Sequence, residues 1–287
     1  MRANFFLTAI MACGMALAAG AGAIAQEARS EMVPLDYVAP TDPQHTATYE
    51  FAKKTRLLER ASAFFTPFKL PKPLALKTRE CAGDINAYYE NDVITICYEY
   101  LRYIDELAKA RTRPAELSET DAFLGPAIEV FLHEGAHALF EYLKIPLLGK
   151  EEDAADQLAS LGLLSFGDET SRKLMAGVLH MYMVEGGYKN IRKLNRRRFA
   201  IVNAKESSDE HSTPLQRMYS ALCMASGSGK PGYAELAKKA GLSPDRAELC
   251  PGEFQQVVYA FRTLLLPHID PAKTSEMRKY EWFKAAQ

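Results

Sequence analysis

The 287-residue sequence lacks a strong excess of charge, a dense set of cysteines, internal repeats and low-complexity tracts. Its 35 Lys and Arg residues nearly balance its 36 Asp and Glu residues, which gives no electrostatic case for nucleic-acid binding. Five cysteines are too few for a disulfide-dense miniprotein. Because 48% of the residues are hydrophobic and 25% are charged, the chain is neither disordered nor collagen-like, and we expect a globular protein.

An apolar run over residues 5–19 is too short to cross a bilayer comfortably, and Arg2 is the one charged residue before it. The run passes into small residues that include the A-x-A pattern of residues 23–25. These are the features of a secretory signal peptide over residues 1–25. We therefore expect cleavage after Ala25, a periplasmic or secreted mature protein, and no stable membrane insertion afterwards.

The cysteines agree with export. Cys13 would leave with the signal peptide, and the four that remain allow three disulfide pairings. We expect the local pairing, Cys81 with Cys97 and Cys223 with Cys250, which closes two modest loops worth roughly 3 kcal/mol each in the chain-entropy model. Four buried free thiols are the alternative, which an oxidising compartment disfavours.

Proline placement and hydrophobic periodicity divide the rest of the chain into elements. Residues 26–45 hold three prolines and no helical period, so we expect an extended lead-in, followed by a single domain over residues 46–287. Candidate strands, which predict a small antiparallel sheet with a hairpin, cover residues 74–78, 85–89 and 93–97. Helices are expected over residues 46–63, 98–110, from Pro126 past Phe140, and over 151–166, 169–186, 213–226, 232–240 and 252–266. The predicted fold class is α+β, mostly helical, with its sheet before the central helix.

The sharpest chemical signal is the sequence His-Glu-Gly-Ala-His at residues 133–137. Histidines four apart on a helix lie on one face, so the imidazoles of His133 and His137 can bind one zinc ion. Glu134 can then reach a water at the metal and act as its general base. Apolar residues flank the motif on both sides, a setting that disfavours ionisable side chains unless a ligand stabilises them.

A third ligand is expected from the next helix. Glu152 and Asp156 are again four residues apart, and we expect Glu152 to bind the metal while Asp156 accepts the free ring N–H of a histidine ligand. A straight first helix running to Leu143 would place Glu152 roughly 10 Å past the metal, at 1.5 Å per residue. Either that helix ends soon after Phe140 or the two helices cross steeply. Glu151 is the alternative ligand.

Together the two motifs resemble those of the Glu-zincin metallopeptidases, the group that includes thermolysin. More specifically, the chain is similar to a bacterial family of exported metallopeptidases catalogued as a domain of unknown function. The similar stretches are residues 81–99, 133–137, 149–157 and 211–223, with Cys250 beyond them. The resemblance spans most of the chain from about residue 81 to residue 268, and it implies a zincin-like fold, a Zn²⁺ ion and peptide-bond hydrolysis.

Further candidates concern the substrate. In a zincin, a sheet edge beside the active helix can hold the substrate in extended form, and the strand with Asn86 and Tyr88 is our candidate for that edge. His211 lies in a polar loop, and Arg217 and Tyr219 follow it on the next predicted helix. We expect His211 to be catalytic, by stabilising the oxyanion of the tetrahedral intermediate, and Arg217 and Tyr219 are further candidates for substrate contact.

The sequence therefore predicts an exported, monomeric zinc metallopeptidase that acts on a peptide or protein substrate. One alternative is a zinc-binding envelope protein without turnover, which the intact Glu134 disfavours, because a structural zinc site has no use for a base. Another alternative is a metal-free helical envelope protein that docks on anionic surfaces through the basic run at residues 192–198. A solvated face with acidic partners is the better explanation of that run.

Overall fold

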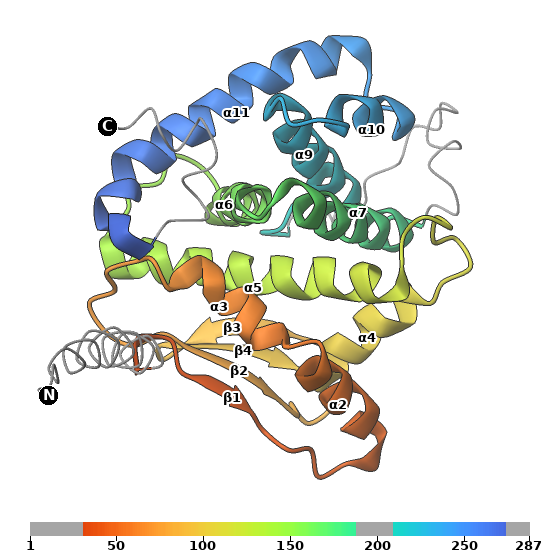
Figure 1. Cartoon of the computed structure of the whole chain (residues 1–287), viewed down its shortest axis with the longest axis vertical. Coiled ribbons are helices and arrows are strands. Elements are labelled where there is room, and N and C mark those ends of the chain that lie inside the picture. Colours follow the sequence, from red (N-terminus) through yellow and green to blue (C-terminus); the bar gives the residue numbers. More distant parts are fainter. Residues whose placement is uncertain (1–30, 188–208, 274–287) are drawn as a thin grey trace, which may run out of the picture.

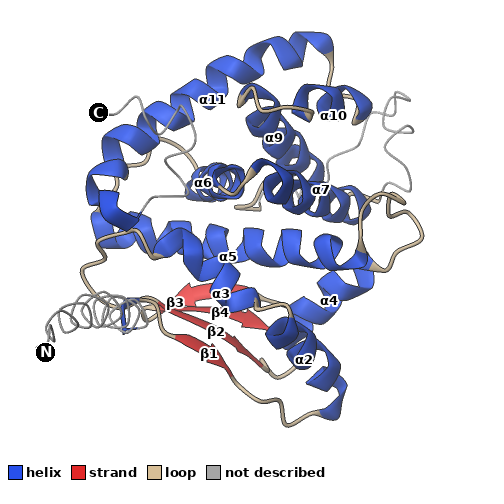
Figure 2. Ribbon diagram, in the orientation of Figure 1, coloured by secondary structure: helices blue, strands red, loops and turns tan. Residues whose placement is uncertain are grey.

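The computed structural model describes residues 31–187 and 209–273 (Figure 1). The expected signal peptide, the first part of the lead-in and the basic run at residues 192–198 lie outside the described residues. Within them the chain is mostly helical and contains a four-stranded sheet, so the α+β prediction is confirmed (Figure 2). None of the described helices is both long enough and apolar enough to cross a membrane.

The sheet is mixed, and the expectation of a purely antiparallel sheet is wrong. Its strands run in the order β1-β2-β4-β3. They are β1 (Leu35–Tyr37), β2 (Ala75–Arg79), β3 (Ala87–Glu90) and β4 (Val93–Cys97). β3 and β4 form the expected antiparallel hairpin, but β2 pairs parallel with both β1 and β4. The difference arises because β4, and not β3, pairs with β2, which leaves β3 at one edge of the sheet. β1, which was expected within an extended lead-in, pairs with the other side of β2 and forms the opposite edge.

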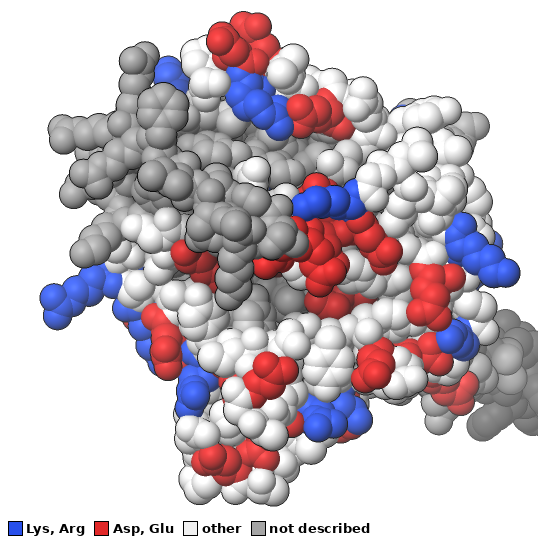
Figure 3. All heavy atoms as spheres, turned by 180° about the vertical axis from the view of Figure 1, so that it is seen from behind, with Lys and Arg blue, Asp and Glu red and all other residues white. Residues whose placement is uncertain are grey.

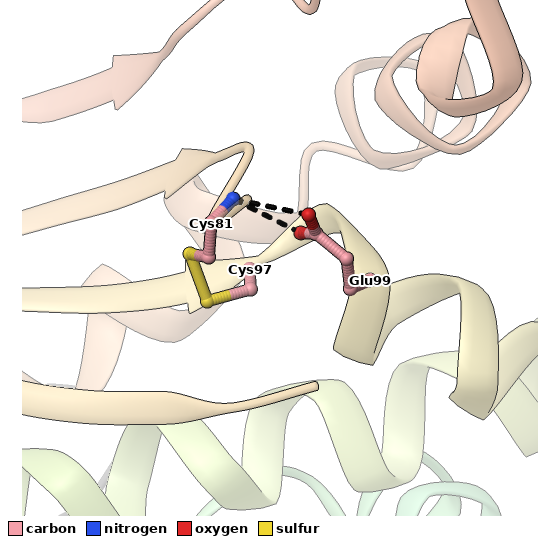
Figure 4. A group of neighbouring side chains, drawn as sticks. All are labelled: Cys81, Cys97 and Glu99. Atoms are coloured by element: carbon pink, nitrogen blue, oxygen red, sulfur yellow. Dashed lines mark hydrogen bonds between the residues drawn. A yellow bond between two sulfur atoms is a disulfide. The ribbon is translucent and has the colours of Figure 1, made fainter. Parts of the chain in front are cut away.

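Short-range geometry explains the hairpin and the loop before it. Asn91 and Asp92 both have positive φ (50° and 66°), as the tight turn of a two-residue hairpin requires. The expected disulfide joins Cys81, in the loop between β2 and β3, to Cys97 at the end of β4 (Figure 4). Both carboxylate oxygens of Glu99 accept the backbone N–H of Cys81, at 3.2 and 3.1 Å. Since the two sulfurs are bonded to each other, this cluster is a covalent anchor and not a metal site.

The first described helices surround the sheet. The single helix expected over residues 46–63 is broken at Arg56, whose φ of 55° is left-handed. The central helix begins at residue 119 and not at Pro126, because the Ser118 side chain caps it by accepting the N–H of Asp121 at 3.0 Å. Pro126 is therefore inside the helix, in a buried position where packing offsets its missing hydrogen bond. The helices of this part are α2 (Thr46–Lys54), α3 (Leu57–Phe65), α4 (Tyr98–Ala108) and α5 (Glu119–Leu143), with the 3-10 turn η1 (Pro43–His45).

The later helices form a second layer. They are α6 (Glu151–Ser165), α7 (Asp168–Glu185), α9 (Pro214–Gly227), α10 (Tyr233–Lys239) and α11 (Pro244–Leu264), followed by the 3-10 turns η3 (Leu266–His268) and η4 (Pro271–Lys273). α11 begins eight residues earlier than expected, since Ser243 caps it and Pro244 suits its first turn. The expected disulfide between Cys223 and Cys250 joins α9 to α11.

α5 lies between the two layers. The sheet with α2 and α3 lies on one side of it, and α6, α7, α9, α10 and α11 lie on the other (Figure 1). Most of its residues are buried. Against α7 the approach is very close, because a Cβ added at Gly125 would lie 2.2 Å from the carbonyl oxygen of Leu174. The His-Glu-x-x-His motif therefore lies on the most enclosed helix of the described chain.

Candidate metal centre

The two motif-bearing helices meet at a steep angle. α5 continues to Leu143 and ends at Lys144, whose φ of 52° is left-handed and turns the chain out of the helix. After a short connection, α6 begins at Glu151. Figure 1 shows α6 nearly end-on while α5 lies across the view. Of the two geometries that the spacing allows, the structure has the steep crossing, and this returns Glu152 to the histidines.

Three donor groups converge where the helices meet. The Nε2 atoms of His133 and His137 are 3.3 Å apart. The Glu152 carboxylate lies 3.0 Å from His133 Nε2 and 3.5 Å from His137 Nε2. A tetrahedral zinc site with bonds of about 2.0–2.1 Å has ligand–ligand edges of roughly 3.3–3.4 Å, so these separations and this donor set fit a zinc ion.

Carboxylates also lie against the opposite nitrogen of each ring. Asp156 Oδ1 is 2.8 Å from His133 Nδ1, and Glu151 Oε1 is 2.8 Å from His137 Nδ1. In this geometry Glu152 lies beside both Nε2 atoms, while Glu151, the alternative ligand, lies behind His137. A carboxylate at Nδ1 holds the N–H there and leaves the Nε2 lone pair free for a metal.

The acidic surroundings favour a cation at this position. Burial lowers the pKa of His133, but Asp156 and Glu152 raise it further, to about 10. Burial alone would raise the pKa of Asp156, yet its bonds to His133 and Arg217 hold it at about 2. The hydrogen bond to His133 also lowers the pKa of Glu152. Asp156 and Glu152 are therefore charged at neutral pH, and they stabilise either a proton on the histidines or a metal ion in its place.

His211 reaches the same group of atoms from the chain before α9. Its Nε2 lies 2.8 Å from Glu152 Oε2, and its ring is stacked on that of His133 with centroids 6.0 Å apart. The loop is held to α6 by the Ser212 hydroxyl, which donates to Asp153 at 2.7 Å. His211 is 44% exposed, so it is the most accessible of the three histidines and faces the solvent side of the centre.

A cleft of about 440 Å³ opens onto these residues. It is lined by residues 86–89 of the β3 edge and by His133, Glu134, His137, Glu152, Glu210 and His211. Burial, together with the charge of Glu152, raises the pKa of Glu134, while the two motif histidines and a backbone hydrogen bond from Tyr89 oppose that shift. Figure 3 shows a group of Asp and Glu side chains near the middle of the face opposite to that of Figure 1.

The structure brings some predicted substrate residues to the cleft and not others. Asn86 and Tyr88 line it. Among the described residues that line the cleft, neither Arg217 nor Tyr219 occurs. Tyr219 packs against the hydrophobic core. Arg217 lies behind Asp156, to which it donates two hydrogen bonds.

Sequence reasoning missed two residues next to this centre. Glu129 is buried on α5, 3.7 Å from the Arg217 guanidinium, and it accepts the hydroxyl of Tyr182 at 2.9 Å. Its signal is present in the sequence, because an acidic residue in an apolar helical run stands one turn before His133. No comparable signal marks Tyr182, since an aromatic residue in an apolar helix is ordinary core material.

The chain matches a protein family described as "Putative metallopeptidase" over residues 37–265. No curated protein and no solved structure shows a significant match to it.

Proposed function

The chain belongs to this family of putative metallopeptidases, and from that premise we propose that it hydrolyses peptide bonds with a zinc ion held by His133, His137 and Glu152. Membership of this family supports a metal-dependent peptidase. The observation that carries the assignment of zinc and its ligands is the convergence of these three donors, from two crossing helices, at the separations of a tetrahedral zinc site. Such a site leaves its fourth position to water or substrate. Zinc in that setting supplies Lewis-acid chemistry, because it lowers the pKa of water and polarises a carbonyl group.

Glu134 is the proposed general base. It stands between the two histidines in the chain and lines the cleft, where it can take a proton from the attacking water. Its burial raises its pKa, which makes it a better proton acceptor than an exposed carboxylate while the nearby histidines keep it ionisable. After the attack it can pass that proton to the leaving amine.

The β3 edge and His211 are the proposed substrate contacts. β3 is the outer strand of the sheet and forms one wall of the cleft, so an extended peptide can pair with it through backbone hydrogen bonds. Asn86 and Tyr88 lie along that wall. His211 can donate a hydrogen bond to the oxygen that becomes negative when the peptide carbonyl is attacked.

We also propose that the protein acts outside the cytoplasm as a monomer, on a peptide or protein substrate. Two disulfides and the lack of a membrane-crossing helix among the described residues are compatible with an exported protein. The A-x-A pattern before Gln26 supports cleavage after Ala25.

A peptide-library digest tests the proposed activity. The purified protein, with its zinc content measured, is incubated with mixed peptides whose products are identified by mass spectrometry. We expect cleavage that a chelator abolishes and added zinc restores. A protein that carries one zinc per chain yet cuts no peptide would support the non-catalytic zinc-binding protein instead. A protein that binds no zinc would overturn the ligand assignment.

A further inference from the structure

A chain of buried and half-buried polar side chains extends from His133 away from the cleft. Asp156 Oδ1 lies 2.8 Å from His133 Nδ1. On its other side, Asp156 accepts two hydrogen bonds from Arg217, from Nε to Oδ2 at 2.8 Å and from Nη2 to Oδ1 at 2.5 Å. The Asp156 and Arg217 side chains are only 13% and 19% exposed. Both carboxylate oxygens are therefore engaged by one planar guanidinium group.

Arg217 is itself held by a further pair of buried residues. Its Nη2 lies 3.7 Å from Glu129 Oε1, and the same oxygen accepts the Tyr182 hydroxyl at 2.9 Å. The guanidinium carbon lies 4.8 Å from the centroid of the Tyr182 ring, within the range of a cation–π contact. The four residues come from α5, α6, α7 and α9, so the contacts join four helices at one point.

Arg217 lies between the two acidic residues of this network. Glu129 and Asp156 bring two carboxylates into a buried region, and Arg217 is the cation between them. Burying such charges is costly, and apolar packing can replace a buried ion pair of purely structural purpose. Apolar residues in place of this network could not orient the ring of His133, which the network contacts through Asp156.

We propose that Arg217 is a positioning residue for the metal centre, which it orients through Asp156. A carboxylate turns easily about its last side-chain bond, and the two parallel hydrogen bonds from an arginine fix its plane. Asp156 then keeps the N–H on His133 Nδ1 and directs the Nε2 lone pair toward His137 and Glu152. Glu129 and Tyr182 fix the guanidinium from behind. This inference rests on the proposed function in one respect, that His133 binds a metal.

Zinc affinity of substituted proteins tests the inference. For the full chain we compare wild type, Arg217→Gln and Asp156→Asn by competition with a chromophoric zinc chelator. Loss of an outer-shell partner lowers metal affinity by roughly 10- to 100-fold, and we expect this range for both variants. Because both changes act on the ring of His133, the double variant should lose little more affinity than Asp156→Asn alone. Arg217→Lys keeps the charge without the planar fork and should fall between wild type and Arg217→Gln.

Arg246→Gln is the matched control. Arg246 also makes two hydrogen bonds to one carboxylate, both of 2.7 Å to Glu253, and neither residue lines the cleft. The control removes an ion pair that also has two hydrogen bonds but is more exposed, at 35% and 47%, and it should leave zinc affinity unchanged. If Arg217→Gln fails to fold, Arg217→Lys and Tyr182→Phe carry the test, since both retain most of the side-chain volume.

The possible results separate this inference from the proposed activity. Unchanged zinc affinity in Arg217→Gln, or a loss fully additive with that of Asp156→Asn, would overturn the positioning role. Reduced turnover at unchanged zinc affinity would also overturn it, and would favour direct contact between Arg217 and the substrate. If instead zinc affinity falls as expected but no form of the protein cleaves peptides, the positioning role holds and the proposed peptidase activity fails.

Discussion

Replacing Gly135 with alanine should destabilise the protein and weaken metal binding, although alanine is the better helix former. Gly135 lies between His133 and His137 on α5 and faces α3. A Cβ added there would lie 2.1 Å from Cζ of Phe65, about 1.4 Å short of the roughly 3.5 Å at which carbon atoms pack. Phe65 is fully buried and packs edge to face on Phe64, with ring centroids 5.3 Å apart, so it has no solvent space to turn into.

The expected magnitude follows from two opposing effects. Alanine gains about 1 kcal/mol over glycine inside a helix. Overpacking a well-filled core costs typically about 1–3 kcal/mol, and an overlap of this size belongs near the upper end. Gly135→Ala should therefore lower the free energy of unfolding by about 1–2 kcal/mol. Gly252→Ala in α11 is the matched control, because a Cβ there meets nothing within 4 Å, and it should raise stability by roughly 0.5–1 kcal/mol.

Urea unfolding of the metal-free proteins measures both changes, and chelator competition measures zinc affinity. Zinc affinity should fall in Gly135→Ala and stay constant in Gly252→Ala, since only the first displaces the backbone that carries the histidines. Phe65→Leu removes the edge of the ring, so the double variant should be more stable than the sum of the two single changes allows. If Gly135→Ala stabilises the protein as Gly252→Ala does, or shows no coupling to Phe65, the packing argument is wrong.

Three further predictions concern the hairpin, the solvent-facing histidine and the half-buried carboxyl group of Glu185. Replacing both Cys81 and Cys97 with alanine removes a disulfide between residues 16 positions apart, and it should lower the free energy of unfolding in urea by about 3 kcal/mol. An unchanged urea midpoint would contradict this. His211→Ala should lower kcat by about 10²- to 10³-fold and leave zinc affinity nearly intact in chelator competition, whereas a loss of zinc like that of a ligand variant would make His211 a ligand. Burial raises the pKa of Glu185 to about 7 against the effect of Arg217. The native state then holds this proton more tightly than the unfolded chain, so the free energy of unfolding should fall as pH rises from about 4.5 to 7. Glu185→Gln should make the free energy of unfolding less dependent on pH when unfolding is measured across this range.

Local sequence patterns predict the elements whose causes are local. The β-branched run at residues 93–97 and the Asn91-Asp92 turn are sufficient to predict the hairpin, because both act within a few residues. The mixed character of the sheet is not predictable in this way, since the pairing of β2 with β4 and of β1 with β2 joins segments far apart in the chain. Ser118, a good N-cap residue, marks the observed start of α5 in the sequence. Pro126 suits a first helical turn equally well, and for that reason the start of the helix was expected seven residues too late.

The candidate site also has a part that local sequence patterns predict and a part that depends on how the helices pack. Spacing alone groups His133 with His137, and Glu152 with Asp156, because residues four apart share a helix face. The distance between the two pairs depends on how α6 crosses α5, which the spacing leaves open. The position of Arg217 depends on the packing of α9 against α6, a contact without a local signature. A residue expected beside the substrate therefore lies behind the metal centre, bonded to Asp156.

Turnover of Glu134→Gln at equal zinc content is the decisive measurement for the proposed zinc-dependent peptidase with Glu134 as its general base. Both the variant and the wild type are loaded with zinc, their bound metal is quantified, and hydrolysis of one cleaved peptide is followed. We expect equal zinc occupancy and a turnover lower by about 10²- to 10⁴-fold or more in the variant, since general-base assistance contributes on that scale. If the variant instead loses zinc but regains full turnover when reloaded, Glu134 is a ligand and not the base.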